Sequence, residues 1–126
     1  MTTNKEYAAR RKDLMSQMHK NSIAIISSAP EKIRSRDTHY PYKQNVNLSY
    51  LCGFPEPESV LVLIPGRENG ETILFCRDKD PLRETWDGYR EGPKGAVKNF
   101  GADDAFPISD IDDILPNLIE GKDRLY

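Results

Sequence analysis

Apolar residues near the start of the chain recur at the spacing of an amphipathic helix, with charged residues between them. The apolar positions on this face are Tyr7, Leu14 and Met18. Thr3 and Glu6 have the spacing of a capping box, in which each side chain bonds a backbone N–H at the first helical turn. The sequence therefore predicts a helix from about residue 4 to about residue 19.

Short aliphatic runs in the first two thirds of the chain have the length of strands. Residues 22–28 and 60–64 are typical of interior strands, and we expect a further short strand at residues 48–51. Residues 65–70 are rich in Pro, Gly and Asn, which favour turns. Residues 72–76 are again apolar, so the pattern predicts an antiparallel hairpin between 60–64 and 72–76.

Helical and strand patterns alternate in the last third of the chain. Asp80 and Pro81 favour the start of a short helix that runs to Trp86. A second short helix is expected at 93–100, closed by Gly101, because glycine accepts the left-handed conformation that ends helices. We also expect an edge strand at residues 106–108, a final helix with one apolar face, and the beginning of a strand at residues 125–126; the apolar positions of that helix are Ile111, Ile114, Leu115 and Leu118.

This order of elements predicts an α/β fold, with a mixed β-sheet flanked by helices, and not a strict βαβ repeat. A length of 126 residues fits one domain over residues 1–126. The balance of 18 basic and 20 acidic residues gives a net charge of −2, which disfavours nucleic acid as the partner. The longest aliphatic run is too short to cross a membrane. Cys52 and Cys76 have neither metal-type nor redox-type spacing, so we expect buried thiols and a cytoplasmic protein.

The residue types that carry catalysis are sparse. The only histidines are His19, expected as a cation near the end of the first helix, and His39, expected in a loop. Acidic residues cluster at predicted turns and helix starts, where carboxylates are favoured for structural reasons. Gly-rich phosphate loops and nucleophile elbows are not found in the sequence. The sequence therefore predicts a domain with no catalytic residue, no metal ligand and no cofactor of its own.

Several sequence motifs carry a family resemblance that spans nearly the whole chain. They are Arg36-Asp, Tyr40-Pro-Tyr-Lys-Gln-Asn45, Tyr50-Leu-Cys-Gly-Phe-Pro-Glu-Pro-Glu58, Val60-Leu-Val-Leu63, Asp78, Glu84-Thr-Trp-Asp-Gly-Tyr-Arg90 and the segment from Ile108 to Leu115. In this order and spacing they resemble the N-terminal domain of Xaa-Pro aminopeptidases (aminopeptidase P), in the creatinase and prolidase group. The resemblance implies the ribonuclease H-like fold of that domain. It also implies that the sequence is the N-terminal part of a longer metallopeptidase, a hydrolase that removes an N-terminal residue preceding proline.

The rest of the expected function also comes from the resemblance. A C-terminal "pita-bread" domain would hold a pair of manganese or other divalent ions, which activate water for attack on the peptide bond before proline. The expected partners are that domain, peptides with proline in second position, and further copies of the protein in a dimer or tetramer. This domain would supply oligomer contacts and part of the rim of the active site.

Two residues of this chain match rim positions of the family. Trp86 is expected to reach toward a neighbouring subunit's active site, where an indole offers a flat apolar wall to a proline ring. Asp37 is expected at the same rim. Ordinary packing of Trp86, or pairing of Asp37 with Arg34 or Arg36, are the structural alternatives. Arg90 is also placed to pair with an acidic side chain, and we expect it to matter less for function than Trp86 and Asp37 do.

Three other functions remain open from the sequence. The first is a peptide- or protein-binding module from a pita-bread relative that has lost hydrolysis. The second is a prolidase-type dipeptidase. The third is a free-standing small α/β domain whose long loop, residues 34–59, binds a small polar ligand.

Overall fold

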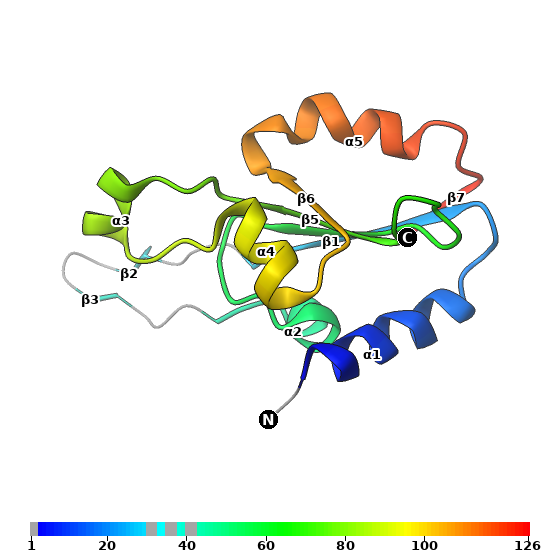
Figure 1. Cartoon of the computed structure of the whole chain (residues 1–126), viewed down its shortest axis with the longest axis horizontal. Helices are drawn as coiled ribbons and strands as arrows, with labels where there is room; N and C mark the ends of the chain where they lie inside the picture. Colours follow the sequence, from blue (N-terminus) through cyan, green and yellow to red (C-terminus); the bar gives the residue numbers. More distant parts are fainter. Residues whose placement is uncertain (1–2, 30–32, 35–37, 40–42) are drawn as a thin grey trace.

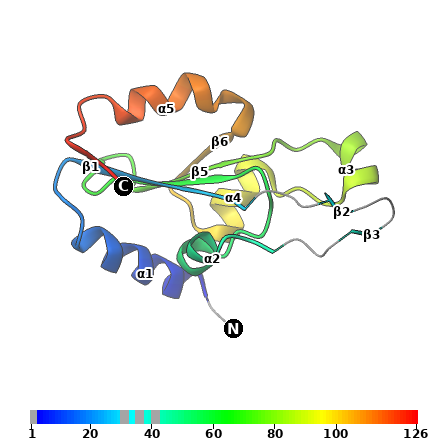
Figure 2. The same ribbon diagram turned by 180° about the vertical axis from the view of Figure 1, so that it is seen from behind.

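The computed structural model describes residues 3–29, 33–34, 38–39 and 43–126, and it has three layers (Figure 1). The helices are α1 (Asn4–Ser16), α2 (Val46–Cys52), α3 (Pro81–Asp87), α4 (Gly92–Phe100) and α5 (Ile111–Ile119), with a 3-10 turn η1 (Ile108–Asp110) before α5. The strands are β1 (Ser22–Ser27), β2 (Ile33–Arg34), β3 (Thr38–His39), β4 (Val60–Leu63), β5 (Thr72–Cys76), β6 (Asp104–Pro107) and β7 (Arg124–Leu125). Helix α5 covers one face of the main sheet, and α1, α2 and α4 lie on the other, as the reverse view in Figure 2 also shows.

The main sheet has five strands in the order β6-β5-β4-β1-β7. Strands β1, β4 and β5 are antiparallel neighbours, whereas β6 runs parallel to β5 and β7 runs parallel to β1. The predicted hairpin is confirmed as β4 and β5, and the predicted edge strand is confirmed as β6. A mixed sheet flanked by helices is therefore the observed fold.

Alternation of side chains along the strands divides the apolar residues into two cores, because successive residues of a strand point to opposite faces. Leu61, Leu63 and Leu74 face α1, α2 and α4. Val62 and Phe75, with the other apolar residues of that face, lie under α5. The predicted apolar face of α5 packs on this second core. Both faces of β4 and β5 are buried, which explains why apolar residues follow one another without interruption at 60–63 and 73–76.

The expected strand at 48–51 is wrong, because these residues belong to helix α2. The Asn45 side chain caps this helix by accepting from the backbone N–H groups of Asn47 and Leu48 at 2.9 and 3.2 Å. Gly53 ends the helix with a φ of 71°, in the left-handed region. The buried residues of α2 are Leu48, Leu51 and Cys52, which have the i, i+3, i+4 spacing of one helical face.

Helix α1 is shorter than predicted and ends at Ser16. The next two backbone N–H groups, of Gln17 and Met18, donate to Leu14 and Met15, three residues back, so the last turn tightens and the helix stops. His19 lies beyond this end and so is not in the last turn of the helix, where we expected it. The predicted caps of α3 and α4 are confirmed at Asp80 and Gly101.

Candidate functional site

Residues 77–91 leave the end of β5, form α3 and return to the start of α4; we call them the α3 arm. The arm projects from one end of the sheet, on the side where β2 and β3 lie (Figure 1). Trp86 is 84% exposed, Leu82 77% and Tyr89 66%. Three large apolar side chains close together in sequence are therefore open to solvent. Such an exposed group is typical of a contact surface.

Short polar contacts give the arm its internal shape. The Asp80 carboxylate accepts from the backbone N–H of Arg83 at 3.2 Å and caps α3. Glu84 Oε1 accepts from Lys79 Nζ at 2.8 Å and from the backbone N–H of Arg90 at 2.9 Å. The hydrogen bond to Lys79 lowers the pKa of Glu84 below its usual value, and the same bond raises the pKa of Lys79.

Two further contacts close the arm on itself. Arg90 Nη1 donates to the backbone carbonyl of Asp78 at 3.4 Å. Lys79 Nζ lies 4.0 Å from the centre of the Tyr89 ring, which is a cation–π contact. The segments before and after α3 are thereby held side by side.

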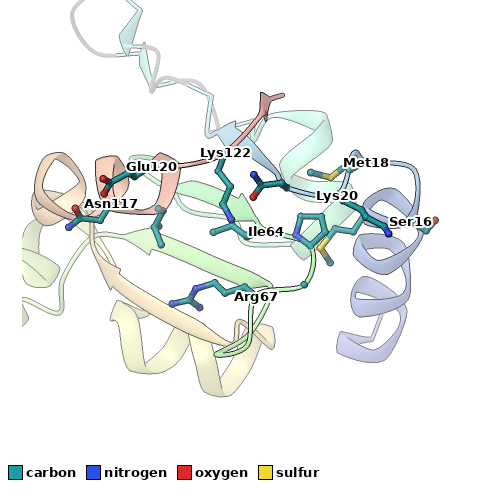
Figure 3. A pocket seen from close by; sticks show the side chains of 13 residues that line it. Ser16, Met18, Lys20, Ile64, Arg67, Asn117, Glu120 and Lys122 are labelled. Atoms are coloured by element: carbon teal, nitrogen blue, oxygen red, sulfur yellow. The ribbon is translucent and has the colours of Figure 1, made fainter.

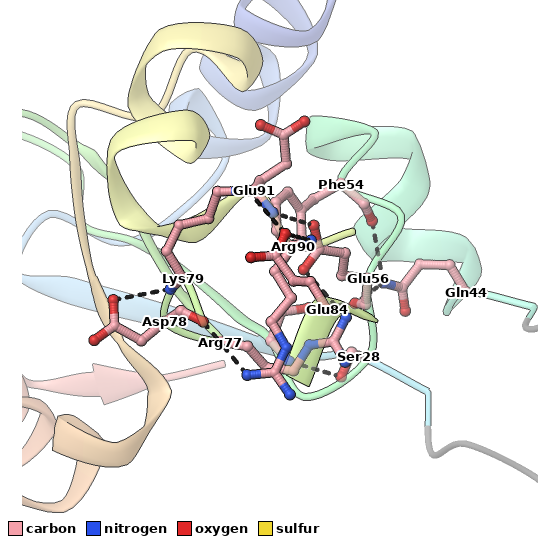
Figure 4. Close-up of polar contacts among 11 residues, drawn as sticks. Ser28, Gln44, Phe54, Glu56, Arg77, Asp78, Lys79, Glu84, Arg90 and Glu91 are labelled. Carbon is pink, nitrogen blue, oxygen red and sulfur yellow. Dashed lines mark hydrogen bonds and ion pairs between the residues drawn. The ribbon is translucent and has the colours of Figure 1, made fainter. Parts of the chain in front are cut away.

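A buried carboxylate lies where the arm meets the sheet (Figure 4). Glu56 is 7% exposed, and both of its carboxylate oxygens accept a hydrogen bond. Oε1 accepts from Arg77 Nη2 at 3.3 Å, and Oε2 accepts from the backbone N–H of Glu91 at 2.8 Å. Arg77 and Glu91 are the first and last residues of the arm. One side chain therefore contacts both ends of it.

The backbone of Glu56 is itself held in place. Its carbonyl accepts from Gln44 Nε2 and from Ser59 Oγ, each at 2.9 Å. Gln44 Nε2 also donates to the carbonyl of Phe54 at 3.1 Å, and the backbone N–H of Ser59 donates to Ser28 Oγ at 3.0 Å. Ser28 directly follows β1, so the hydrogen bonds continue from the sheet to Glu56 and from Glu56 to the arm.

A hollow of about 680 Å³ lies at the end of the sheet opposite the arm (Figure 3). The end of α1, the turn between β4 and β5 and the end of α5 surround it. Its charged residues are Lys20, Arg67, Glu120 and Lys122. Arg67 is already paired with Asp104 at 3.6 Å and donates to the carbonyl of Gly70. The hollow is thus lined by charged side chains of both signs together with apolar ones, and its lining contains no recognisable catalytic group.

The described part of the chain contains neither a metal-binding cluster nor a reactive thiol. No three His, Cys, Asp or Glu residues come together there in a way that could hold a metal ion. Cys52 and Cys76 are both buried, and burial raises the pKa of the Cys76 thiol to about 12, so a thiolate nucleophile is disfavoured. None of the helices formed by these residues has the length and apolar character that a membrane crossing requires.

The family model of the aminopeptidase P N-terminal domain matches residues 7–126. The chain belongs to this family. It is 41% identical to the Xaa-Pro aminopeptidase of Escherichia coli over 125 residues, which cover 98% of the chain and 28% of that enzyme. It is 38% identical to human Xaa-Pro aminopeptidase 3, covering 90% of the chain and 25% of that protein. The chain thus spans less than a third of the length of these relatives and corresponds to their N-terminal part.

Solved structures agree with this assignment. The aminopeptidase PepP of Pseudomonas aeruginosa is 61% identical and superimposes with a TM-score of 0.96, over 99% of the chain and 28% of that structure. Zinc-substituted Escherichia coli aminopeptidase P in complex with product is 40% identical, with a TM-score of 0.92, over 99% of the chain and 29% of that structure. The resemblance and the fold expected from the sequence are both confirmed.

Of the two rim residues predicted from the sequence, the structure describes only Trp86. Trp86 lies on α3 with its ring in solvent, so it is not packed in the core of this chain. Asp37 lies outside the described residues. Sequence reasoning missed Glu56 as a residue of interest, although its motif was noted. The available signal was a carboxylate between Pro55 and Pro57, in a segment that leads into a buried strand.

Proposed function

We propose that residues 1–126 form one domain, the non-catalytic N-terminal domain of a metal-dependent Xaa-Pro aminopeptidase. The observation that carries this proposal is the match of nearly the whole chain to the N-terminal part of enzymes with that name. Catalysis then takes place in a C-terminal domain of the same polypeptide, which removes an N-terminal residue preceding proline. We place the protein in the cytoplasm, because its two cysteines are buried thiols.

The metal belongs to that C-terminal domain in this proposal. A pair of manganese or other divalent ions would supply a nucleophilic hydroxide and polarise the scissile carbonyl. The residues described here do not bring together the ligands that such a pair requires. The isolated chain should therefore bind no stoichiometric Mn²⁺ in calorimetry and should not cleave Xaa-Pro peptides. Turnover by a preparation free of other peptidases would contradict the proposal.

The contribution of this domain would be contacts between subunits and part of the active-site rim. Trp86 is the leading rim residue, supported by the exposure of its ring on a projecting arm. Its flat apolar face suits a proline ring or the tail of a longer peptide. The proposal keeps Asp37 as a second rim residue on the family resemblance alone. Leu82 and Tyr89 enlarge the apolar surface around Trp86 and suit a subunit contact.

Substitution of Trp86 in the longer polypeptide tests the rim. Trp86→Ala should lower kcat/KM for longer peptides by about tenfold or less, because one aromatic contact contributes on the order of 1 kcal/mol. Metal content should not change. Val46→Ala is a suitable control, because Val46 is 76% exposed but lies on α2. Unchanged kinetics in Trp86→Ala would remove this residue from the rim.

A second candidate is a peptide- or protein-binding module from a relative that has lost hydrolysis. The exposed apolar side chains of the arm favour it, since they suit binding without any catalytic step. The sequence of the C-terminal domain distinguishes the two: an active enzyme should retain two Asp, one His and two Glu in metal-ligand order. A prolidase-type enzyme would keep these ligands but would cleave only dipeptides, so assays with dipeptides and tripeptides separate it.

A further inference from the structure

Buried carboxylates are uncommon unless they are paired, because desolvation disfavours the charged form. Glu56 is a buried carboxylate in this chain, at 7% exposed, and its two partners lie at the two ends of the α3 arm. A charge-assisted bond from a guanidinium holds one end, and a bond from a backbone N–H holds the other. The unfavourable free energy of burying this carboxylate is thus offset by two hydrogen bonds, and these same bonds hold the two ends of the arm in place.

No side chain of the arm that the structure describes is buried, and its helix α3 has seven residues. Most helical stability in proteins comes from the packing of an apolar face. The large apolar side chains of α3, Leu82 and Trp86, are exposed and do not provide such packing. The hydrogen bonds of Glu84 with Lys79 and with the N–H of Arg90, and that of Arg90 with the carbonyl of Asp78, lie within the arm. The two hydrogen bonds of Glu56 connect both ends of the arm to the segment that leads into β4.

We propose that Glu56 is a positioning residue that sets the place and order of Trp86 through the ends of the α3 arm. Gln44 and Ser59 hold the backbone of Glu56 in turn, so the position of the arm is set by the sheet. The structural part of this inference is independent of the enzyme. Its kinetic part rests on the proposed role of Trp86 at the active-site rim.

Trp86 makes the structural part measurable. It is the only tryptophan of the chain, so tryptophan fluorescence reports the motion of the arm without a signal from any other tryptophan. In Glu56→Gln, an NH2 group replaces one of the two accepting oxygens, so the hydrogen bond from either Arg77 or the N–H of Glu91 is lost. The amplitude of nanosecond depolarisation of Trp86 should then rise about twofold, as expected for a locally released segment. Glu58→Gln is the matched control, an exposed glutamate two positions away that should leave the depolarisation unchanged.

Circular dichroism and thermal unfolding show whether each variant keeps its sheet. If Glu56→Gln does not fold, Glu56→Asp replaces it, because the shorter side chain keeps the charge but cannot reach both ends of the arm. Increased Trp86 depolarisation in whichever variant folds supports the inference. Depolarisation equal to that of the unsubstituted chain in a folded variant would overturn it.

The kinetic part uses a double-mutant cycle in the longer polypeptide. If Glu56 acts through Trp86, Glu56→Gln should lower kcat/KM for longer Xaa-Pro peptides, and the double variant should be no worse than Trp86→Ala. Additive losses would mean that Glu56 does not act through Trp86, and would overturn the kinetic part. No effect of Trp86→Ala itself would instead count against the proposed rim, while the fluorescence result would still decide whether Glu56 positions the arm.

Discussion

The sheet and the α3 arm are stabilised by opposite means. Strands β4 and β5 bury aliphatic side chains on both faces, and residues such as Leu61 and Phe75 have no exposed surface. The arm leaves its largest apolar residues in water, and its described contacts are mostly hydrogen bonds and ion pairs. Burial of apolar surface thus accounts for the stability of the sheet, and directional polar contacts account for the geometry of the arm.

This difference suggests how a rigid domain can present an apolar surface for binding a partner. Apolar side chains packed in a core cannot bind a partner, because their contacts are already satisfied within the chain. The arm keeps Leu82, Trp86 and Tyr89 available, while its polar contacts limit the conformations that a partner would have to order. A short helix that is held from its two ends meets both requirements.

The largest expected effect compares one aromatic residue from each region. Phe75→Ala should reduce the free energy of unfolding by about 3–5 kcal/mol, because it leaves a cavity under α5. Trp86→Ala should change it by less than about 0.5 kcal/mol, because its ring is 84% exposed. Urea denaturation followed by circular dichroism measures both. A loss above about 1 kcal/mol in Trp86→Ala would mean that the arm adds to global stability.

A smaller effect separates steric contact from backbone strain at two glycines. Gly53 and Gly66 both have left-handed φ values, of 71° and 81°. A Cβ on Gly53 would lie 2.5 Å from the ring of Tyr7, whereas a Cβ on Gly66 would meet no atom within 4 Å. Gly66→Ala should cost about 1 kcal/mol from strain, and Gly53→Ala should cost clearly more. Equal losses by denaturation would show that the Tyr7 ring moves aside freely.

The smallest effect is the pH dependence of the arm. The pKa of Glu84 is lowered from 4.5, so its contribution is present above pH 4.5 and is lost as the pH falls through the lowered pKa. The pKa of Lys79 is raised from 10.5, so its contribution is present below pH 10.5 and is lost as the pH rises through the raised pKa. Acidification should therefore loosen the arm, seen as a larger amplitude of nanosecond depolarisation of Trp86.

The variant Glu84→Gln provides the control for this titration. The acid change in Trp86 depolarisation should shrink in this variant, since the titrating partner of Lys79 is gone. An acid change as large as in the unsubstituted chain would show that the Lys79–Glu84 pair does not order the arm.

Local signals in the sequence were sufficient for most of the fold. The turn at Pro65 and Gly66 between two aliphatic runs predicted the β4–β5 hairpin, and Asp80-Pro81 predicted the start of α3. The failure at α2 has a physical reason. A run as short as 48–51 fits either element, and its helical state depends on the Asn45 cap and the Gly53 stop on either side.

The candidate site was less accessible to sequence reasoning. Trp86 was identified only through a family resemblance, because nothing in its neighbours shows that its ring is exposed. Glu56 could not be recognised at all as the residue that holds the arm. Its partners Arg77 and Glu91 lie 21 and 35 residues further along the chain, and only the folded structure brings the three together.

The bond between Glu56 and residue 91 has an evolutionary consequence, because its donor is a main-chain amide and not a side chain. Nineteen of the twenty genetically encoded amino acids carry such an amide, so drift at position 91 leaves this bond intact. Proline alone lacks the donor. A proline at position 91 would remove the hydrogen bond to Glu56 Oε2 and so release one end of the arm, while Glu56 would keep its charge.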